Sequence, residues 1–221
     1  MKKRRKPREL IMYEYLLRRK SLSHEEMRKY RTLKKGYEGE LLFDRYIESL
    51  PGDFIFLHDL WLSYRNRAFQ IDHILIINNT LYLYEIKNFP GEYYYENEKL
   101  YFETGKEVDD PLTQLKRNES LLRQLLYSLG YQIPLQAVVV FVNPPECTLY
   151  QAPRTSKILL PTQLKQYFQH LQTSTAIDPI FHKLEEKFES IRLEKSPYEQ
   201  LPSYNYNDIK KVSHVNLAIT F

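Results

Sequence analysis

Apolar residues recur along the chain with two different periods, and the period separates the expected helices from the expected strands. Helical spacing predicts a helix over residues 9–31, with a restart near Ser23 and Glu26, which have the spacing of a capping box. A second helix is expected over residues 41–50, directly after the segment GYEGE. Glu40 would then lie at the start of that helix.

Strands are expected where β-prone apolar residues alternate or form short runs. Residues 54–62 predict a first strand, residues 69–77 and 80–88 a hairpin, and residues 92–103 a second hairpin. The pair Asn78-Asn79 tolerates the positive φ angles that a two-residue turn requires. The first hairpin therefore has a defined register.

In that register the cross-strand partners are Ile77 with Thr80, Leu75 with Tyr82, and Asp72 with Glu85. Both faces of the hairpin are largely apolar, which is typical of central strands that are covered on both sides. One face holds Ile74, Ile76, Leu81 and Leu83; the other holds Ile71, Leu75, Ile77, Tyr82 and Ile86.

The second half of the chain predicts a helix, a strand and further helices. Asp110-Pro111 suits a helix start, and that helix is expected to run to about Leu129. The short apolar run 136–142 is typical of a buried parallel strand. A strand at 158–160, a helix across TQLKQYFQHL, a helix over 178–193 and an irregular tail from Ser196 complete the expected elements. The order predicts one α/β domain with peripheral helices.

Composition limits the compartment and the class of protein. The chain has 221 residues and a single cysteine, Cys147, so no intramolecular disulfide can form and a reducing cytoplasm is expected. No apolar run approaches the roughly 20 residues that cross a bilayer. The basic start MKKRRKPR is followed by Glu9 and Glu14, which do not suit a signal peptide. We expect a cytoplasmic protein without a membrane segment.

Charge is distributed unevenly along the chain. Residues 1–35 hold 14 of the 32 Lys and Arg residues but only 4 of the 28 Asp and Glu residues. We therefore expect a basic helical arm at 1–35, a core domain at 36–152, and a C-terminal helical extension with an irregular tail at 153–221. Such an arm suits a polyanion, because phosphate contacts release counterions. Its expected nucleic-acid contacts are Lys2, Lys3, Arg4, Arg5 and Lys6. The alternative is a solubilising leader without a partner.

Candidate chemistry gathers in the first hairpin. Asp72 and Glu85 would repel each other across the strands, and a divalent cation between them would turn that repulsion into a binding site. Lys87 projects from the same face as Glu85, because side chains alternate along a strand. Carboxylate oxygens with the Ile86 carbonyl suit Mg²⁺ or Mn²⁺, and an ammonium group can stabilise charge that develops on a phosphate. The pattern indicates metal-assisted phosphodiester hydrolysis.

The motifs GYEGE, QIDHILII, YEIKN and DPLTQ, in this order, resemble the nuclease-related domain (NERD) family of the PD-(D/E)XK nuclease superfamily. The resemblance covers roughly residues 36–145. It implies an α/β fold with a restriction-endonuclease-like αβββαβ core, a central mixed sheet flanked by helices, and a divalent-metal nuclease. The residues that the resemblance identifies as catalytic are Glu40, Asp72, Glu85, Lys87 and Gln114, with Asp72, Glu85 and Glu40 as metal ligands. Gln70 stands where family members often carry Glu.

The sequence leaves several alternatives open. Glu40 could line the site, or it could stabilise the helix dipole at a helix start. The expected function is a Mg²⁺-dependent nuclease acting on DNA, and the rival is a non-catalytic nucleic-acid-binding or protein-interaction module with the same fold. A nuclease domain that docks on a partner through residues 153–221 is a third option. Nucleases of this design often cut both strands as dimers, so a homodimer is also an option. No phosphate-cradling glycine loop or nucleophile elbow is present.

Overall fold

The computed structural model describes residues 3–143, 147–154, 158–171 and 176–210. The chain forms two compact units. The first unit comprises residues 1–4 and 38–197, and the second comprises residues 5–37 and 198–221. The three-part division expected from the sequence stays a prediction, for which a truncation after residue 152 is the test.

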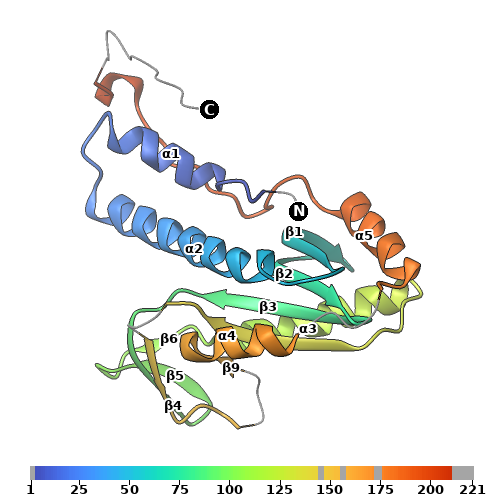
Figure 1. The fold of residues 1–221 in the computed structure, drawn as a ribbon. Coiled ribbons are helices and arrows are strands. Elements are labelled where there is room, and N and C mark those ends of the chain that lie inside the picture. The colour runs from blue at the N-terminus through green and yellow to red at the C-terminus, as the bar shows by residue number, and fades with distance from the viewer. Residues whose placement is uncertain (1–2, 144–146, 155–157, 172–175, 211–221) are drawn as a thin grey trace. The chain divides into compact units, whose positions relative to one another are not determined.

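The first unit is built on a five-stranded mixed sheet with strand order β1-β2-β3-β7-β9 (Figure 1). Strands β1, β2 and β3 are antiparallel, and β7 and β9 continue the sheet in parallel. The bounds of these strands are β1 Ile55–Tyr64, β2 Arg67–Ile77, β3 Thr80–Lys87, β7 Leu135–Phe141 and β9 Ile158–Leu159. A smaller sheet has the order β6-β5-β4-β8, with β4 Gly91–Glu96, β5 Lys99–Phe102, β6 Glu107–Val108 and β8 Cys147–Tyr150.

Helices cover both faces of the central sheet. The covering helices are α2 His24–Glu48, α3 Pro111–Ser128, α4 Pro161–His170 and α5 Pro179–Ile191. The second unit contributes α1 Arg8–Leu17 and a short 3₁₀ turn η1 at Tyr206–Asp208. The expected αβββαβ order is confirmed as α2-β1-β2-β3-α3-β7, with the small sheet inserted between β3 and α3. Among the described residues, no helix is both long and apolar enough to cross a membrane.

Two apolar cores lie on the two faces of the central sheet. Helices α3 and α5 pack on one face with residues such as Leu122 and Phe188, and α2 and α4 pack on the other with Phe43 and Phe168. At about 25 cal/mol per Å² of buried apolar surface, side chains of this size contribute roughly 2–3 kcal/mol each. The sheet is thus held rigid on both sides, as the two-faced apolar pattern predicted.

The β2–β3 hairpin has the predicted register. Asn78 and Asn79 have φ angles of 49° and 58°, and the ladder pairs Ile77 with Thr80 and Leu75 with Tyr82. The assignment of Ile71 to the face of Leu75 was wrong, because Ile71 packs in the opposite core, with Ile74 and Ile76. The alternation of faces inverts at the residue between Ile71 and His73, which is Asp72.

Helix α2 differs most from the expectation. A single 25-residue helix runs from His24 to Glu48 and passes through both Gly36 and Gly39. Its start is the predicted capping box, in which Glu26 N–H donates to Ser23 Oγ and Ser23 N–H donates to Glu26 Oε2. The expected position of Glu40 at a helix start was therefore wrong, and stabilisation of a helix dipole does not account for this residue.

The two glycines of α2 predict opposite effects of alanine substitution. Gly36 is exposed with open space around it, so Gly36→Ala should raise the free energy of unfolding by about 0.5–1 kcal/mol. A Cβ at Gly39 would come within 2.6 Å of Asn88 Cβ and 3.2 Å of Val142 Cγ2, so Gly39→Ala should cost about 1–3 kcal/mol. Urea unfolding measures both. Shifts of the same sign would contradict this view of how α2 packs on the sheet.

The second unit contains α1 and the first part of α2, together with the C-terminal segment that follows residue 197. Lys210 N–H donates to the Arg19 carbonyl at 2.9 Å, which ties the C-terminal segment to the end of α1. Ion pairs join Lys29 to Glu9 at 3.2 Å and Lys20 to Glu26 at 2.7 Å. With the pairs Lys6–Glu14 and Arg8–Glu199, part of the basic charge in the arm therefore has an acidic partner within this unit.

Candidate active site

Asp72 lies at an interruption in the sheet. The β1–β2 ladder begins with the pair Ile55 and Ile76 and ends with the pair Tyr64 and Arg67. It omits one pair, at the position where Asp59 stands opposite Asp72. The β2–β3 ladder ends at His73–Tyr84, one pair before Asp72 would meet Glu85. There the Ile86 N–H donates to Asp72 Oδ2 at 2.9 Å, so the carboxylate replaces a backbone carbonyl as the acceptor. The Asp72 side chain is thereby fixed beside strand β3.

Glu85, Lys87 and Gln114 form a hydrogen-bonded series next to Asp72. The Lys87 ammonium lies 2.8 Å from Glu85 Oε1 and donates to Gln114 Oε1 at 3.0 Å. Glu85 is 2% exposed, whereas Gln114 lies exposed in the first turn of α3. That turn is positioned by its N-cap, Asp110, which accepts from Leu112 N–H and Thr113 N–H.

The acids of this region raise one another's pKa. Burial, reinforced by the charge of Asp72, raises the pKa of Glu85 to about 8 against the opposing effect of Lys87. Burial also raises the pKa of Asp72, although the Ile86 N–H and the Lys87 charge oppose it. A group of desolvated acids whose charges repel is costly to ionise, and a nearby divalent cation is what would favour ionisation.

Glu40 projects from the middle of α2 toward the same acids. Burial raises its pKa to about 8, the charge of Asp72 adds to the rise, and Arg4 opposes it. Arg4 Nη1 forms an ion pair with Glu40 Oε2, so one oxygen of this carboxylate already has a cationic partner. The structure thus links Glu85, Lys87 and Gln114 through contacts of the Lys87 ammonium beside Asp72, and it places Glu40 near enough for the charge of Asp72 to raise the pKa of Glu40.

Arg4 does not occupy the position expected for a phosphate-gripping residue. Its side chain is 2% exposed and forms a two-point ion pair with Asp44, with Nε–Oδ2 at 2.8 Å and Nη2–Oδ1 at 3.1 Å. His73 Nε2 contacts the same Asp44 oxygen at 2.8 Å. Burial disfavours the Asp44 anion, but His73 and Arg4 outweigh it and lower the pKa of Asp44 to about 2. We therefore remove Arg4 from the set of expected nucleic-acid contacts, because a buried, fully paired guanidinium cannot grip phosphate.

The other basic residues of the N-terminus are placed differently. Lys3 and Arg5 are exposed, and Lys6 is paired with Glu14 at 2.9 Å. Surface pairs of this kind contribute little, so the pairing leaves Lys6 able to exchange Glu14 for phosphate. Lys2 lies outside the described residues. Nucleic-acid contact by Lys2, Lys3, Arg5 and Lys6 stays a prediction.

Asp59 is the residue of this region that the sequence analysis missed. It has a φ angle of 51°, unusual for a non-glycine residue, and its charge raises the pKa of both Glu40 and Asp72. Gln70 Nε2 donates to Asp59 Oδ1 at 3.0 Å, and Arg192 donates to its carbonyl at 3.0 Å. An acid inside the apolar run FLHDLWL was the available signal.

The donor set suits a hard divalent cation, although it is not assembled as a complete cage. Asp72 and Glu85 supply carboxylate oxygens of the type that Mg²⁺ prefers. Within the part of the chain that the structure describes, no group of three His, Cys, Asp or Glu side chains is close enough to hold an ion. A metal at Asp72 and Glu85 would therefore need further oxygen ligands from the backbone or from water, which is usual for Mg²⁺.

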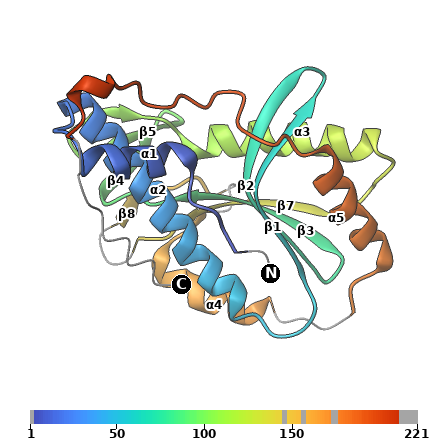
Figure 2. The same ribbon diagram turned by 90° about the horizontal axis from the view of Figure 1, so that it is seen from above.

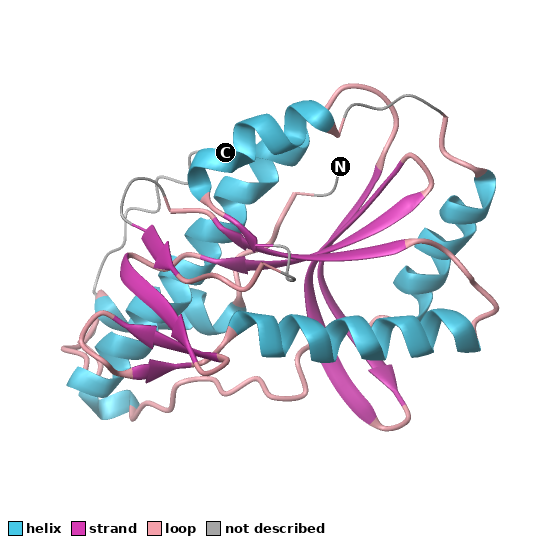
Figure 3. Cartoon of the chain, turned by 90° about the horizontal axis from the view of Figure 1, so that it is seen from below, coloured by secondary structure: helices cyan, strands magenta, loops and turns pink. Residues whose placement is uncertain are grey.

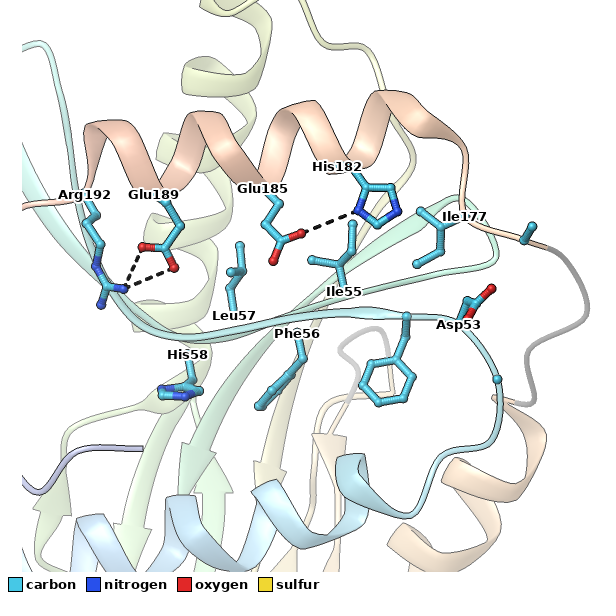
Figure 4. A pocket seen from close by; sticks show the side chains of 13 residues that line it. Asp53, Ile55, Phe56, Leu57, His58, Ile177, His182, Glu185, Glu189 and Arg192 are labelled. Atoms are coloured by element: carbon cyan, nitrogen blue, oxygen red, sulfur yellow. Dashed lines mark hydrogen bonds and ion pairs between the residues drawn. The ribbon is translucent and has the colours of Figure 1, made fainter. Parts of the chain in front are cut away.

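A pocket of about 670 Å³ between β1 and α5 lies apart from these acids, since none of Glu40, Asp72, Glu85, Lys87 and Gln114 lines it. In Figure 4, Glu185 and Glu189 extend from α5 over strand β1, and Glu189 pairs with Arg192 at 3.2 Å. These carboxylates would repel a phosphate backbone. The pocket is not part of the candidate active site.

The raised pKa of Glu85 predicts a pH-dependent effect of Glu85→Gln on stability. Between the ordinary pKa of a glutamate and about pH 8, the folded chain holds a proton that the unfolded chain has released. The Glu85 contribution to stability is therefore present at low pH and lost as pH rises toward 8. With a chelator present to remove divalent ions, the free energy of unfolding of Glu85→Gln should increase relative to that of wild type as pH rises from 5 to 8. Thermal unfolding across this range measures the difference.

The exposed residue Glu186 offers a control for that measurement, because Glu186→Gln removes a solvent-exposed glutamate of α5. This variant should track wild type at each pH. A stability difference between Glu85→Gln and wild type that stays constant from pH 5 to 8 would contradict the assignment of Glu85 as a buried, proton-holding acid.

Comparison with known proteins shows one family model that matches this region. Residues 35–142 match the model of the nuclease-related domain. Among solved structures, the small subunit of the heterodimeric restriction endonuclease R.BspD6I is similar at 12% identity, over 82% of this chain and 86% of that chain, with a TM-score of 0.28. A likeness this weak carries no argument about function. No curated protein has significant sequence similarity to the chain.

Proposed function

We propose, because residues 35–142 match the model of the nuclease-related domain, that the chain is a divalent-metal-dependent nuclease that hydrolyses phosphodiester bonds, with DNA as the substrate. One arrangement supports the proposal most. The Lys87 ammonium contacts both Glu85 and Gln114, directly beside the buried Asp72. Two desolvated acids can supply oxygen ligands to a divalent ion, and an ammonium beside them can stabilise charge on a phosphate, which suits metal-assisted hydrolysis.

Each residue of the site has a distinct task in this proposal. Asp72 and Glu85 would hold the metal, Mg²⁺ or Mn²⁺, and the bound ion would polarise the scissile phosphate and activate water. Lys87 orients the attacking water and stabilises negative charge that develops on the phosphate. Gln114 holds the Lys87 ammonium in place by accepting its hydrogen bond. Glu40, whose carboxylate pairs with Arg4, would supply a further oxygen ligand from α2.

Cleavage of plasmid and single-stranded DNA by purified protein tests the proposal. Wild type should cut in Mg²⁺ and not in chelator, and Asp72→Asn should not cut. Glu186→Gln is the matched control, because it changes one exposed glutamate of α5 to an amide and should cut like wild type. Equal cutting by wild type and Asp72→Asn would point to a contaminating nuclease and overturn the proposal.

The rival function is a nucleic-acid-binding module that has the same fold but does not cleave the nucleic acid. It is favoured by two observations: Glu40 is already paired with Arg4, and no three-residue metal cage is assembled among the described side chains. Such a module would bind DNA with a steep dependence on salt but would take up no metal at Asp72 and Glu85.

The cytoplasmic location and a homodimeric state also stay predictions.

A further inference from the structure

A basic notch lies on the surface of the first unit, where strand β2 passes helix α3. We use this name for the hollow of about 400 Å³ that is lined by Arg67, Arg117, Ser120, Leu121 and Gln124. We propose that the basic notch binds backbone phosphates of the nucleic-acid strand that enters the candidate active site. This inference rests on the proposed function, and it identifies a substrate-binding surface separate from the N-terminal arm.

The notch is created by the way the β1–β2 hairpin crosses α3. Asn118 Nδ2 donates to the Gln70 carbonyl at 2.9 Å and so attaches the helix to strand β2. Beyond this contact the hairpin continues past the helix and its turn projects freely, as Figures 2 and 3 show from opposite sides. Arg67 lies on this projecting part and is carried to the side of α3 that bears Arg117.

The charge of the notch is not neutralised locally. Arg67 and Arg117 are exposed, and neither forms an ion pair with any described residue. The nearest acid on the same helix, Glu119, is already paired with Arg123 at 2.7 Å. Guanidinium groups present several donors in a planar fork, which suits the oxygens of a phosphate better than a point charge does.

A neutral donor completes the lining of the notch. Gln124 Nε2 donates to Ser120 Oγ at 3.2 Å, which leaves the Ser120 hydroxyl hydrogen available for an anion. The pocket between β1 and α5 suits phosphate less well, because Glu185 and Glu189 line it and its one arginine, Arg192, is paired with Glu189. On this unit, phosphate is therefore favoured at the basic notch.

The notch lies at a distance from the candidate active site that one strand can bridge. Gln114 and Arg117 are three residues apart on one face of α3, about 4.5 Å along the helix axis. Asp72 and Arg67 are five residues apart on β2, about 16 Å along the strand. Because a strand of a duplex advances about 3.4 Å per nucleotide, the notch would contact phosphates roughly one to five nucleotides from the bond that is cut.

Fluorescence anisotropy in chelator tests the notch without turnover. The probes are labelled single-stranded DNA, the duplex of the same sequence, and RNA of the same length. Arg67→Ala/Arg117→Ala should bind at least about tenfold more weakly, with the salt slope of log K reduced by about two. The matched control is Lys183→Ala/Lys187→Ala, which removes two exposed cations from α5 and should bind like wild type.

Each outcome decides the inference. Loss of affinity in the notch variant alone supports it, and the probe with the largest loss identifies the polymer that the notch holds. The inference is overturned if the notch variant binds the probes as tightly as wild type, or if both double variants lose affinity equally. It is also overturned if wild type binds none of the probes. The proposed function fails separately: a wild type that binds through the notch but cuts nothing in Mg²⁺ would overturn hydrolysis and leave the notch in place.

If the protein does cut, steady-state kinetics give a second readout. The notch variant should raise KM while kcat stays close to wild type, because a contact away from the reacting bond stabilises bound substrate and transition state alike. A loss in kcat with an unchanged KM would contradict a role in substrate binding.

Discussion

Lys87→Ala is expected to lower kcat for DNA cleavage by about 10²–10³-fold, the usual cost of losing a donor that stabilises charge in a transition state. The Lys87 side chain is 18% exposed, and its ammonium contacts Glu85 at 2.8 Å and Gln114 at 3.0 Å. Few neighbouring waters can replace an ammonium held in this way. Single-turnover cleavage in Mg²⁺ measures the effect directly.

Two further measurements separate catalysis from folding in this variant. Lys99→Ala removes a lysine that pairs with Glu107 on the small sheet, and it should cut like wild type. Thermal unfolding of Lys87→Ala should show that the fold persists, since the raised pKa of Glu85 leaves this acid protonated near neutral pH, where it needs no cationic partner. A folded Lys87→Ala that cuts at the wild-type rate would remove Lys87 from the mechanism.

Arg4→Ala is expected to lower the free energy of unfolding by about 3–5 kcal/mol, because it leaves the buried carboxylate of Asp44 without its cation. Asp44 has its pKa lowered to about 2, so its ionised form contributes to stability above the ordinary aspartate pKa, and this contribution is lost as pH falls through about 2. Removal of Arg4 takes away one cause of that stabilisation. Urea unfolding at neutral pH measures the loss.

The neighbouring residue offers a close control for Arg4. Arg5→Ala removes the same side chain from an exposed position and should change stability by less than about 0.5 kcal/mol. Arg4→Lys should rescue only in part, because a lysine cannot form the two-point contact with Asp44. Equal unfolding midpoints for Arg4→Ala and Arg5→Ala would show that the buried ion pair does not stabilise the fold.

Local chemistry made the hairpin predictable from the sequence. Asn78 and Asn79 specify a turn, the turn specifies the register, and the register brings Glu85 and Lys87 to one face. The helix start at Asp110 was predictable for the same reason, because its capping hydrogen bonds involve only neighbouring residues. The αβββαβ order follows from such local signals.

Features that depend on distant contacts could not be predicted in this way. Arg4 belongs to a basic run that is typical of a solvated arm, yet its partner Asp44 lies 40 residues away. Gly36 and Gly39 suggest a break, but packing of Gly39 against Asn88 and Val142 keeps the helix continuous. Tertiary contacts override local propensity in both cases.

Asp59 shows a third limit of sequence reasoning. Strict alternation along β1 and β2 places side chains on defined faces, but the alternation inverts where Asp59 stands opposite Asp72. A period-two pattern carries no signal of such an inversion. The structure thereby adds a fourth carboxylate to the surroundings of Glu40, Asp72 and Glu85.

Calorimetric titration with Mn²⁺ tests most directly whether the acids of β2 and β3 form one metal site. Wild type should bind the ion with release of protons, because the raised pKa of Glu85 leaves it protonated near neutral pH. Asp72→Asn should lose this uptake, and Glu186→Gln should retain it. Uptake of the same size in wild type and Asp72→Asn, or no uptake in wild type, would contradict a metal-dependent active site at this position.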